Sequence, residues 1–113
     1  MDVRFENNPA LLADFTLLAR HHLATVATRL GWLDQTPSNA AALYGIWRSF
    51  YSIKCLASFL GLSALATIAY QIETLLLPAR AGDLTISPEQ AQAISQASIS
   101  LEYQLRALTT ELV

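Results

Sequence analysis

The side chains best suited to chemistry lie in one stretch, WRSFYSIKCLASFLG, at residues 47–61. It carries a phenol at Tyr51, an ammonium at Lys54 and a thiol at Cys55. Residues three and four apart are neighbours on a helix surface, so a helix brings these three side chains together. A nucleophile beside a lysine fits group transfer, and the same grouping also fits a binding site or a coincidence of helical spacing.

The phase of this helix determines which side chains face outward. Tyr51 follows Phe50 of an apolar seven-residue stripe, so it is rotated about 100° from the core. On the next helix Glu73 follows Ile72 in the same way, and antiparallel packing would place Glu73 at the same edge of the core. The expected neighbours of Tyr51 on its own helix are Trp47, Lys54, Cys55 and Ser58, with Tyr44 two turns away.

Two interpretations fit this outward face, which carries aromatic rings where a solvated face carries Glu and Lys. In the first, Trp47 and Tyr51 are boundary residues with buried apolar bodies and wet polar tips. Aromatic residues at helical spacing usually have this role, and the pattern by itself favours it. In the second, an aromatic surface of low charge is a docking surface for another protein.

The sequence evidence for other reactive residues is weaker. His21 and His22 are adjacent on one helix, so their side chains point about 100° apart and cannot chelate one metal ion together. Neither has a lysine three residues later that could support a transferred anion, so a boundary or solvent-facing role is the simpler interpretation. Cys55 lies beside Lys54, which favours the thiolate, but it has no histidine nearby in the sequence. No phosphate-binding loop, metal-ligand spacing or catalytic triad is present, so we predict a non-enzyme without metal or cofactor.

Four helical segments are expected to position these residues. Apolar residues recur at helical spacing throughout, and each start carries a recognisable signal, such as the capping box of Ser87, Pro88, Glu89 and Gln90. Pro78 is expected to tighten or kink the end of the third helix. The helices are predicted to run from Pro9, after the cap Asn8, to Gly31, from Thr36 to about Gly61, from Ser63 to Leu77 or Arg80, and from Ser87 to the C-terminus.

The apolar stripes and short connections predict an all-α fold, an antiparallel up-down four-helix bundle. With 113 residues we expect a single domain over residues 1–113. Met1 fits a natural start, and the apolar end at Leu112 and Val113 fits further chain, so a whole protein and the N-terminal part of a larger one are both compatible. Hydrophobic residues make up 53% and charged residues only 14%, which indicates apolar surface left for a partner.

Charge, cysteine content and hydropathy argue against several classes of protein. The net charge is −2 and the basic residues are scattered, so the basic stripe of a nucleic-acid binder is missing. A single cysteine cannot form an internal disulfide and fits a reducing, cytoplasmic location. The polar start MDVRFENNP is no signal peptide. Residues 55–72 carry no charge, but polar residues and Gly61 interrupt them, so we predict no membrane span.

Residues 11–112 resemble a histidine phosphotransfer (HPt) domain, with the N-terminal transfer domain of CheA-type chemotaxis and motility kinases as the nearest type. That family has an aromatic residue and an arginine before His-x-x-Lys-Gly, then Leu-Gly, a helix ending Leu-Glu-x-Leu-Leu and an Arg-x-Gly turn. The corresponding segments of this chain are residues 47–55 (WRSFYSIKC), Leu60-Gly61, residues 72–76 (IETLL) and residues 80–82 (RAG).

The departures from the family pattern concern its reactive centre. The resemblance implies that the phosphate-accepting histidine corresponds to Tyr51 and the following glycine to Cys55. It also implies that Lys54 is the phosphate-supporting lysine and that Glu73 is the acidic residue that binds the histidine ring. A free phenol has a pKa of about 10, and its phosphoester is a poor donor to an aspartate, so a reversible relay would stall at this position.

The resemblance therefore implies a degenerate HPt module of a two-component or chemotaxis-like motility system. It would bind a receiver domain or a histidine-kinase domain through Tyr44, Trp47, Tyr51, Lys54, Cys55, Ser58 and Glu73 without carrying phosphate. The alternative is a helical assembly or localisation module, such as a homodimer, that has lost receiver contact. A third possibility is an active phosphotransfer protein that uses Tyr51 or His22.

Overall fold

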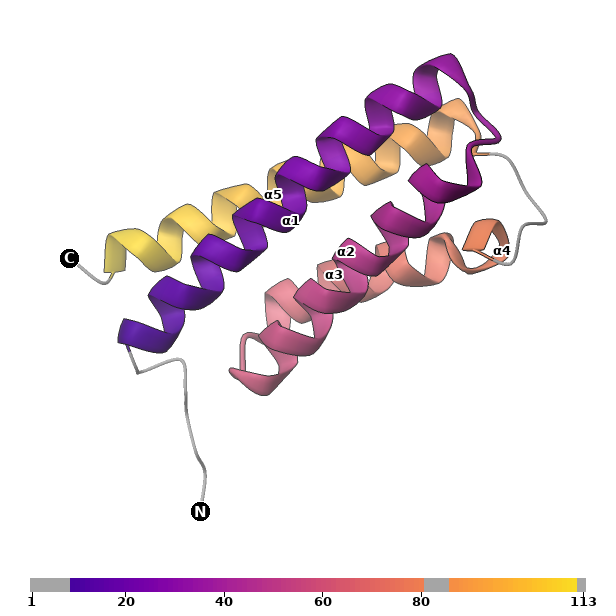
Figure 1. The fold of residues 1–113 in the computed structure, drawn as a ribbon. Coiled ribbons are helices and arrows are strands. Elements are labelled where there is room, and N and C mark those ends of the chain that lie inside the picture. The colour runs from indigo at the N-terminus through magenta and orange to yellow at the C-terminus, as the bar shows by residue number, and fades with distance from the viewer. Residues whose placement is uncertain (1–8, 81–85, 112–113) are drawn as a thin grey trace.

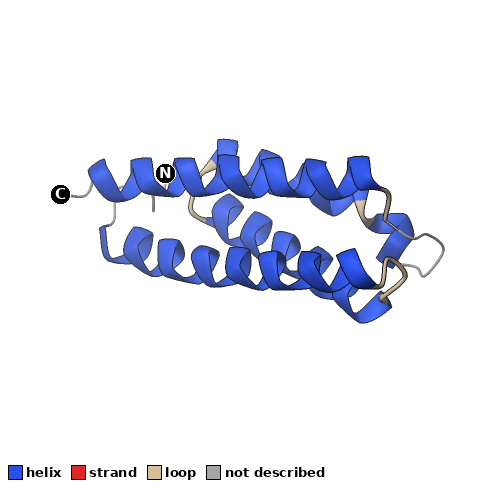
Figure 2. Cartoon of the chain, turned by 90° about the horizontal axis from the view of Figure 1, so that it is seen from above, coloured by secondary structure: helices blue, strands red, loops and turns tan. Residues whose placement is uncertain are grey.

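The computed structural model describes residues 9–80 and 86–111. The helices in this part of the chain are α1 (Pro9–Gln35), α2 (Ala40–Phe59), α3 (Ser63–Leu75), α4 (Leu77–Arg80) and α5 (Pro88–Glu111). The four long helices run alternately up and down, and α4 is a single turn after α3 (Figure 1). Both α1 and α3 pack against α2 and α5, which therefore lie diagonally opposite (Figure 2). The predicted antiparallel four-helix bundle is confirmed.

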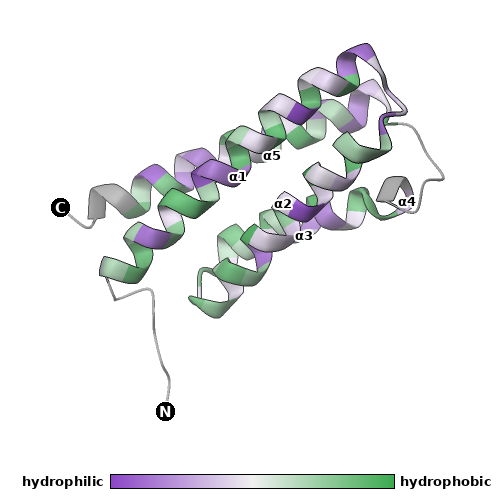
Figure 3. Cartoon of the chain, viewed as in Figure 1, coloured by the Kyte–Doolittle hydropathy of each residue, from purple (hydrophilic) through white to green (hydrophobic). Residues whose placement is uncertain are grey.

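The core consists of the apolar stripes that the sequence predicts. Every expected stripe residue of α2 is buried, namely Leu43, Ile46, Phe50, Ile53, Ala57 and Leu60. The expected residues of α1 and α5 are likewise buried, except for the half-buried Leu30 and Leu108. Hydrophobic residues are densest where α2 turns into α3 (Figure 3). Leu112, also expected in the core, lies outside the described residues.

The helix starts show which capping signals operate. At α5 the capping box forms as expected, since the Ser87 N–H donates to Gln90 Oε1 at 2.9 Å and the Gln90 N–H donates to Ser87 Oγ at 3.1 Å. At α2 the predicted start at Thr36 is wrong. Asn39 is the cap, with its Oδ1 accepting the Ala42 N–H at 3.0 Å, and Thr36 belongs to the preceding turn. The predicted Asn8 cap lies outside the described residues.

Two predicted helix ends are also wrong. Helix α1 continues past Gly31 to Gln35, because Leu33, two residues further on, is buried in the core and offsets the cost of a helical glycine. Helix α3 ends at Leu75 instead of Leu77 or Arg80. Continuing it would place the Pro78 ring against the carbonyl of Thr74, so the chain restarts as α4 after Leu76. The Arg80-x-Gly82 turn of the family pattern lies largely outside the described residues.

The turn between α2 and α3 depends on the left-handed backbone of Gly61, whose φ is +79°. The Gly61 N–H donates to the Ser58 carbonyl at 3.2 Å, and the Leu62 N–H donates to the Ala57 carbonyl at 2.8 Å. This pair of bonds is a Schellman motif, which satisfies the last carbonyls of α2. The turn reverses the chain and brings α3 back along α2.

Replacing Gly61 by alanine should lower the free energy of unfolding by about 1–2 kcal/mol, because an L side chain is strained at this φ. Gly31→Ala is the matched control. It lies inside α1 with no atom within 4 Å of an added Cβ, so alanine there should raise stability by about 1 kcal/mol. Urea denaturation of both variants measures the two effects, and a loss of equal size at Gly31 would contradict this account.

Candidate functional site

Three aromatic rings on α2 form a continuous stack on its outward side. The ring centroids of Tyr44 and Trp47 are 5.9 Å apart, and those of Trp47 and Tyr51 are 5.2 Å apart with an interplanar angle of 17°. Tyr44 and Tyr51 are exposed, whereas Trp47 is partly buried against the core. The stack exists because the buried stripe of α2 leaves these positions on one side of the helix.

Tyr51 is held from both directions along the helix. Trp47 stacks on it from the N-terminal side, and from the C-terminal side the Lys54 Nζ lies 4.6 Å from the Tyr51 ring centroid. The same ammonium lies 5.8 Å from the ring centroid of Tyr70 on α3. Both distances are in the cation–π range. We call the surface made by Tyr44, Trp47, Tyr51, Lys54 and Tyr70 the aromatic face.

An ion pair between α2 and α3 lies beneath this surface. Lys54 Nζ and Glu73 Oε1 are 2.8 Å apart, and only 24% and 11% of the two side chains are exposed. The hydrogen bond to Glu73 raises the pKa of the Lys54 ammonium above its ordinary value; partial burial opposes this shift, and the negative charge of Glu73 supports it. A carboxylate this deeply buried requires a cation, so Lys54 is held in place.

Most of the site residues predicted from the sequence come together. Tyr44, Trp47, Tyr51, Lys54 and Glu73 form one connected set of ring contacts and an ion pair. Cys55 and Ser58 are exposed farther along α2. The charge of Cys55 is one of the causes that raise the pKa of Lys54.

Sequence reasoning missed Tyr70. The available signal was its position three residues before Glu73, which places both side chains on the same side of α3. Its ring contributes to the aromatic face from a second helix, so the site spans α2 and α3 instead of lying on α2 alone.

The two histidines lie on α1. Their ring centroids are 6.1 Å apart in an edge-to-face arrangement. Burial lowers the pKa of His22, and the neighbouring His21 and the Arg48 side chain of α2 act in the same direction. All three causes favour the neutral form of the His22 ring.

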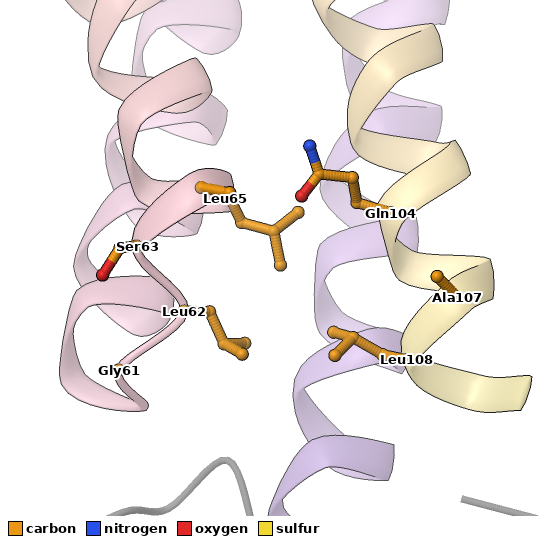
Figure 4. A pocket seen from close by; sticks show the side chains of 8 residues that line it. Gly61, Leu62, Ser63, Leu65, Gln104, Ala107 and Leu108 are labelled. Atoms are coloured by element: carbon orange, nitrogen blue, oxygen red, sulfur yellow. The ribbon is translucent and has the colours of Figure 1, made fainter. Parts of the chain in front are cut away.

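Residues 9–80 and 86–111 contain no group of three or more His, Cys, Asp or Glu side chains placed to hold a metal ion. None of the described helices combines the length and apolar character needed to cross a bilayer. A hollow of about 310 Å³ lies between the start of α3 and the end of α5 (Figure 4). Leucines, alanines, Ser63 and Gln104 line it, and no titratable side chain faces it.

The groups around the Tyr51 phenol limit the chemistry that this position could support. The phenol of Tyr51 has an aromatic ring on one side and an ammonium on the other, and that ammonium is already paired with a carboxylate. An incoming phosphoryl group would have to compete with Glu73 for Lys54. The exposed tyrosine rings, by contrast, offer rigid contact area to a partner.

The fold has counterparts among solved structures. A CheA phosphotransferase domain from Thermotoga maritima superimposes with a TM-score of 0.86 at 17% identity, over 91% of this chain and 98% of that one. A computationally redesigned four-helix bundle superimposes with a TM-score of 0.81 at 13% identity, over 89% of this chain and 99% of that one. No protein-family model and no curated protein sequence matches. The expected resemblance to an HPt domain is thus confirmed for the fold.

Lys54 is the only lysine of the sequence, so NMR of the lysine Cε–Hε group follows its titration alone. Its midpoint should lie above the ordinary value of 10.5. In Glu73→Leu it should fall, because the hydrogen bond to Glu73, the largest cause of the raised pKa, and the Glu73 charge are both lost while burial still lowers the pKa. Since the folded-state pKa is raised, the pair stabilises the fold below about pH 10.5, and this contribution disappears as the pH rises through the folded-state pKa. Equal midpoints in both proteins would refute the pairing.

Proposed function

We propose that this chain is an HPt-like signalling module that binds a receiver domain or a histidine-kinase domain through its aromatic face without carrying phosphate. The observation that supports this proposal most is the position of Tyr51 and the side chains that surround its ring. At the position of the family's phosphate-accepting histidine, a tyrosine is stacked on Trp47 and covered by Lys54, which is paired with Glu73.

Chemistry argues against phosphate transfer at this position. An imidazole nitrogen forms a phosphoramidate that can pass its phosphoryl group on to an aspartate, whereas a phenol forms a stable ester. The other candidate, His22, lies on α1, is half-buried and is followed three residues later by Thr25 instead of a lysine. The proposed module is therefore neither an enzyme nor a phosphate carrier, and it needs no metal or cofactor.

Binding, in contrast, uses what the face retains. Tyrosine, tryptophan and arginine are the residues that contribute most at protein interfaces, and this side of α2 offers Tyr44, Trp47, Tyr51 and the exposed Arg48. No salt bridge joins Arg48 to a carboxylate within the described residues, so its charge is available to an acidic partner surface. We place the module in the cytoplasm with its partners, as a scaffold, competitor or regulator.

Trp47→Ala and Lys54→Ala should each weaken binding to a receiver domain by about tenfold or more, because each removes a central part of the face. Trp32→Ala is the matched control, since Trp32 is an exposed tryptophan on α1 in contact with Arg29, outside the face. Isothermal titration calorimetry against receiver domains from the same genome measures the three affinities. Unchanged affinity in Trp47→Ala and Lys54→Ala would refute the assignment of this face.

Incubation with a phosphorylated receiver should leave the mass of this chain unchanged, because neither the Tyr51 phenol nor His22 is set up as an acceptor. Intact-protein mass spectrometry under non-acidic conditions detects the result. A stable mass increase of one phosphate that disappears in Tyr51→Phe or in His22→Gln would show instead that the module is an active phosphotransfer protein.

A further inference from the structure

Helices α1 and α2 carry cations on a shared outward side that has no carboxylate. No aspartate or glutamate occurs in residues 15–33 or in residues 40–59. Two cations of these ranges are paired with carboxylates of α5 and α3, namely Arg20 and Lys54. Arg29 and Arg48, in contrast, form no salt bridge within the part of the chain that the structure describes. A carboxylate for these two arginines has to come from a partner.

Arg29 is held in a fixed position between the two helices. Its guanidinium carbon lies 4.6 Å from the ring centroid of Trp32, and its Nη1 donates to the Ala41 carbonyl at 3.4 Å. On α2 the guanidinium lies against Gly45, where a Cβ would be only 3.1 Å from the guanidinium carbon. A glycine weakens the interior of a helix relative to alanine, and here it provides the room for Arg29. Because Arg29 is already restrained, it loses less side-chain entropy when it binds a ligand.

Arg48 lies on the same side of the bundle. It comes one turn after Gly45 on α2, so it neighbours the position against which Arg29 lies. Burial, the neighbouring His21 and the charge of Arg48 lower the pKa of His22, so the field of Arg48 reaches α1.

These side chains form one surface. His22 is two helical turns before Arg29 and therefore lies on the same side of α1. We call the surface made by His22, Arg29, Trp32 and Arg48 the cationic face.

We propose that the cationic face binds an acidic segment of a partner protein, with one carboxylate on Arg29 and a second on Arg48. The planar fork of a guanidinium matches the two oxygens of a carboxylate. Trp32 is 46% exposed beside Arg29 and offers its ring to an apolar side chain of the same segment.

Charge complementarity is the reason to choose an acidic occupant. The whole chain has a net charge of −2, so an anionic segment is attracted only where cations gather without carboxylates. A basic segment would be repelled by Arg29 and Arg48, and an apolar one would cover both guanidinium groups without replacing the water that they lose.

This interaction is separate from the proposed function. Arg29 and Trp32 lie outside the aromatic face, and Arg48 lies at the boundary between the two surfaces. A partner on the aromatic face therefore leaves Arg29 and Trp32 uncovered. The cationic face is tested without a receiver domain, so a failure of either proposal does not decide the other.

A titration of the isotopically labelled chain with a blocked hexaglutamate peptide at low ionic strength tests the proposal by NMR. We expect saturable shifts of the Trp32 indole N–H and the Arg29 Nε–H, and none with the matching glutamine peptide. The midpoint of the His22 titration should rise in the complex, because bound carboxylates offset the charge of Arg48. The dissociation constant should increase at least about threefold in Arg29→Gln and in Arg48→Gln.

Arg20→Gln is the matched control. It removes the same charge from α1 at an arginine that is paired with Glu102, so the affinity for hexaglutamate should stay the same. Circular dichroism verifies that all three variants remain folded. The proposal would be overturned by the absence of saturable shifts at Arg29 and Trp32, by equal binding of the glutamine peptide, or by equal weakening in Arg20→Gln. Tighter binding of inorganic phosphate than of hexaglutamate would also overturn it, in favour of a phosphorylated ligand.

Discussion

Burial of one apolar stripe of α2 determines the direction of every side chain on the aromatic face. Phe50 and Ile53 are fully buried between α1 and α3. Because successive side chains on a helix point about 100° apart, this burial fixes the direction of the residues that follow them. Tyr51 and Lys54 each come one position after a stripe residue and therefore share one edge of the helix. A change in this phase would move the whole candidate site.

The second constraint is electrostatic. Glu73 is a nearly buried carboxylate at the α2–α3 boundary, and leaving it without a cation would be costly. Lys54 satisfies it and at the same time covers the ring of Tyr51. The Lys54 ammonium therefore neutralises the Glu73 carboxylate and also packs against the Tyr51 ring, so it fixes the shape of the surface at this point.

Much of the fold followed from the sequence because burial acts on a regular pattern. The stripes of α2, the capping box at Ser87 and the neighbours of Tyr51 depend only on helical spacing, which the bundle preserves. Helix ends were less predictable. Gly31 and Thr36 carry signals for a stop and a start, but the burial of Leu33 and the stronger cap at Asn39 override them.

The sequence predicted the site residues that lie on α2, but it did not predict the full contribution of α3. Spacing placed Trp47 and Lys54 beside Tyr51, whereas the contribution of Tyr70 depends on how far α3 is rotated against α2. Core packing between the helices sets this rotation, so the sequence of either helix alone does not predict it. The reach of a flexible lysine toward Glu73, 2.8 Å in the folded chain, depends in the same way on the distance between the helices.

The most direct test is a two-dimensional NMR titration of the isotopically labelled chain with receiver domains encoded in the same genome. The account predicts chemical-shift changes clustered around Tyr44, Trp47, Tyr51, Lys54 and Tyr70, with the α5 residues unaffected. Shift changes confined to other helices, or none with any receiver, would contradict it and show that the aromatic face is not a docking surface for these partners.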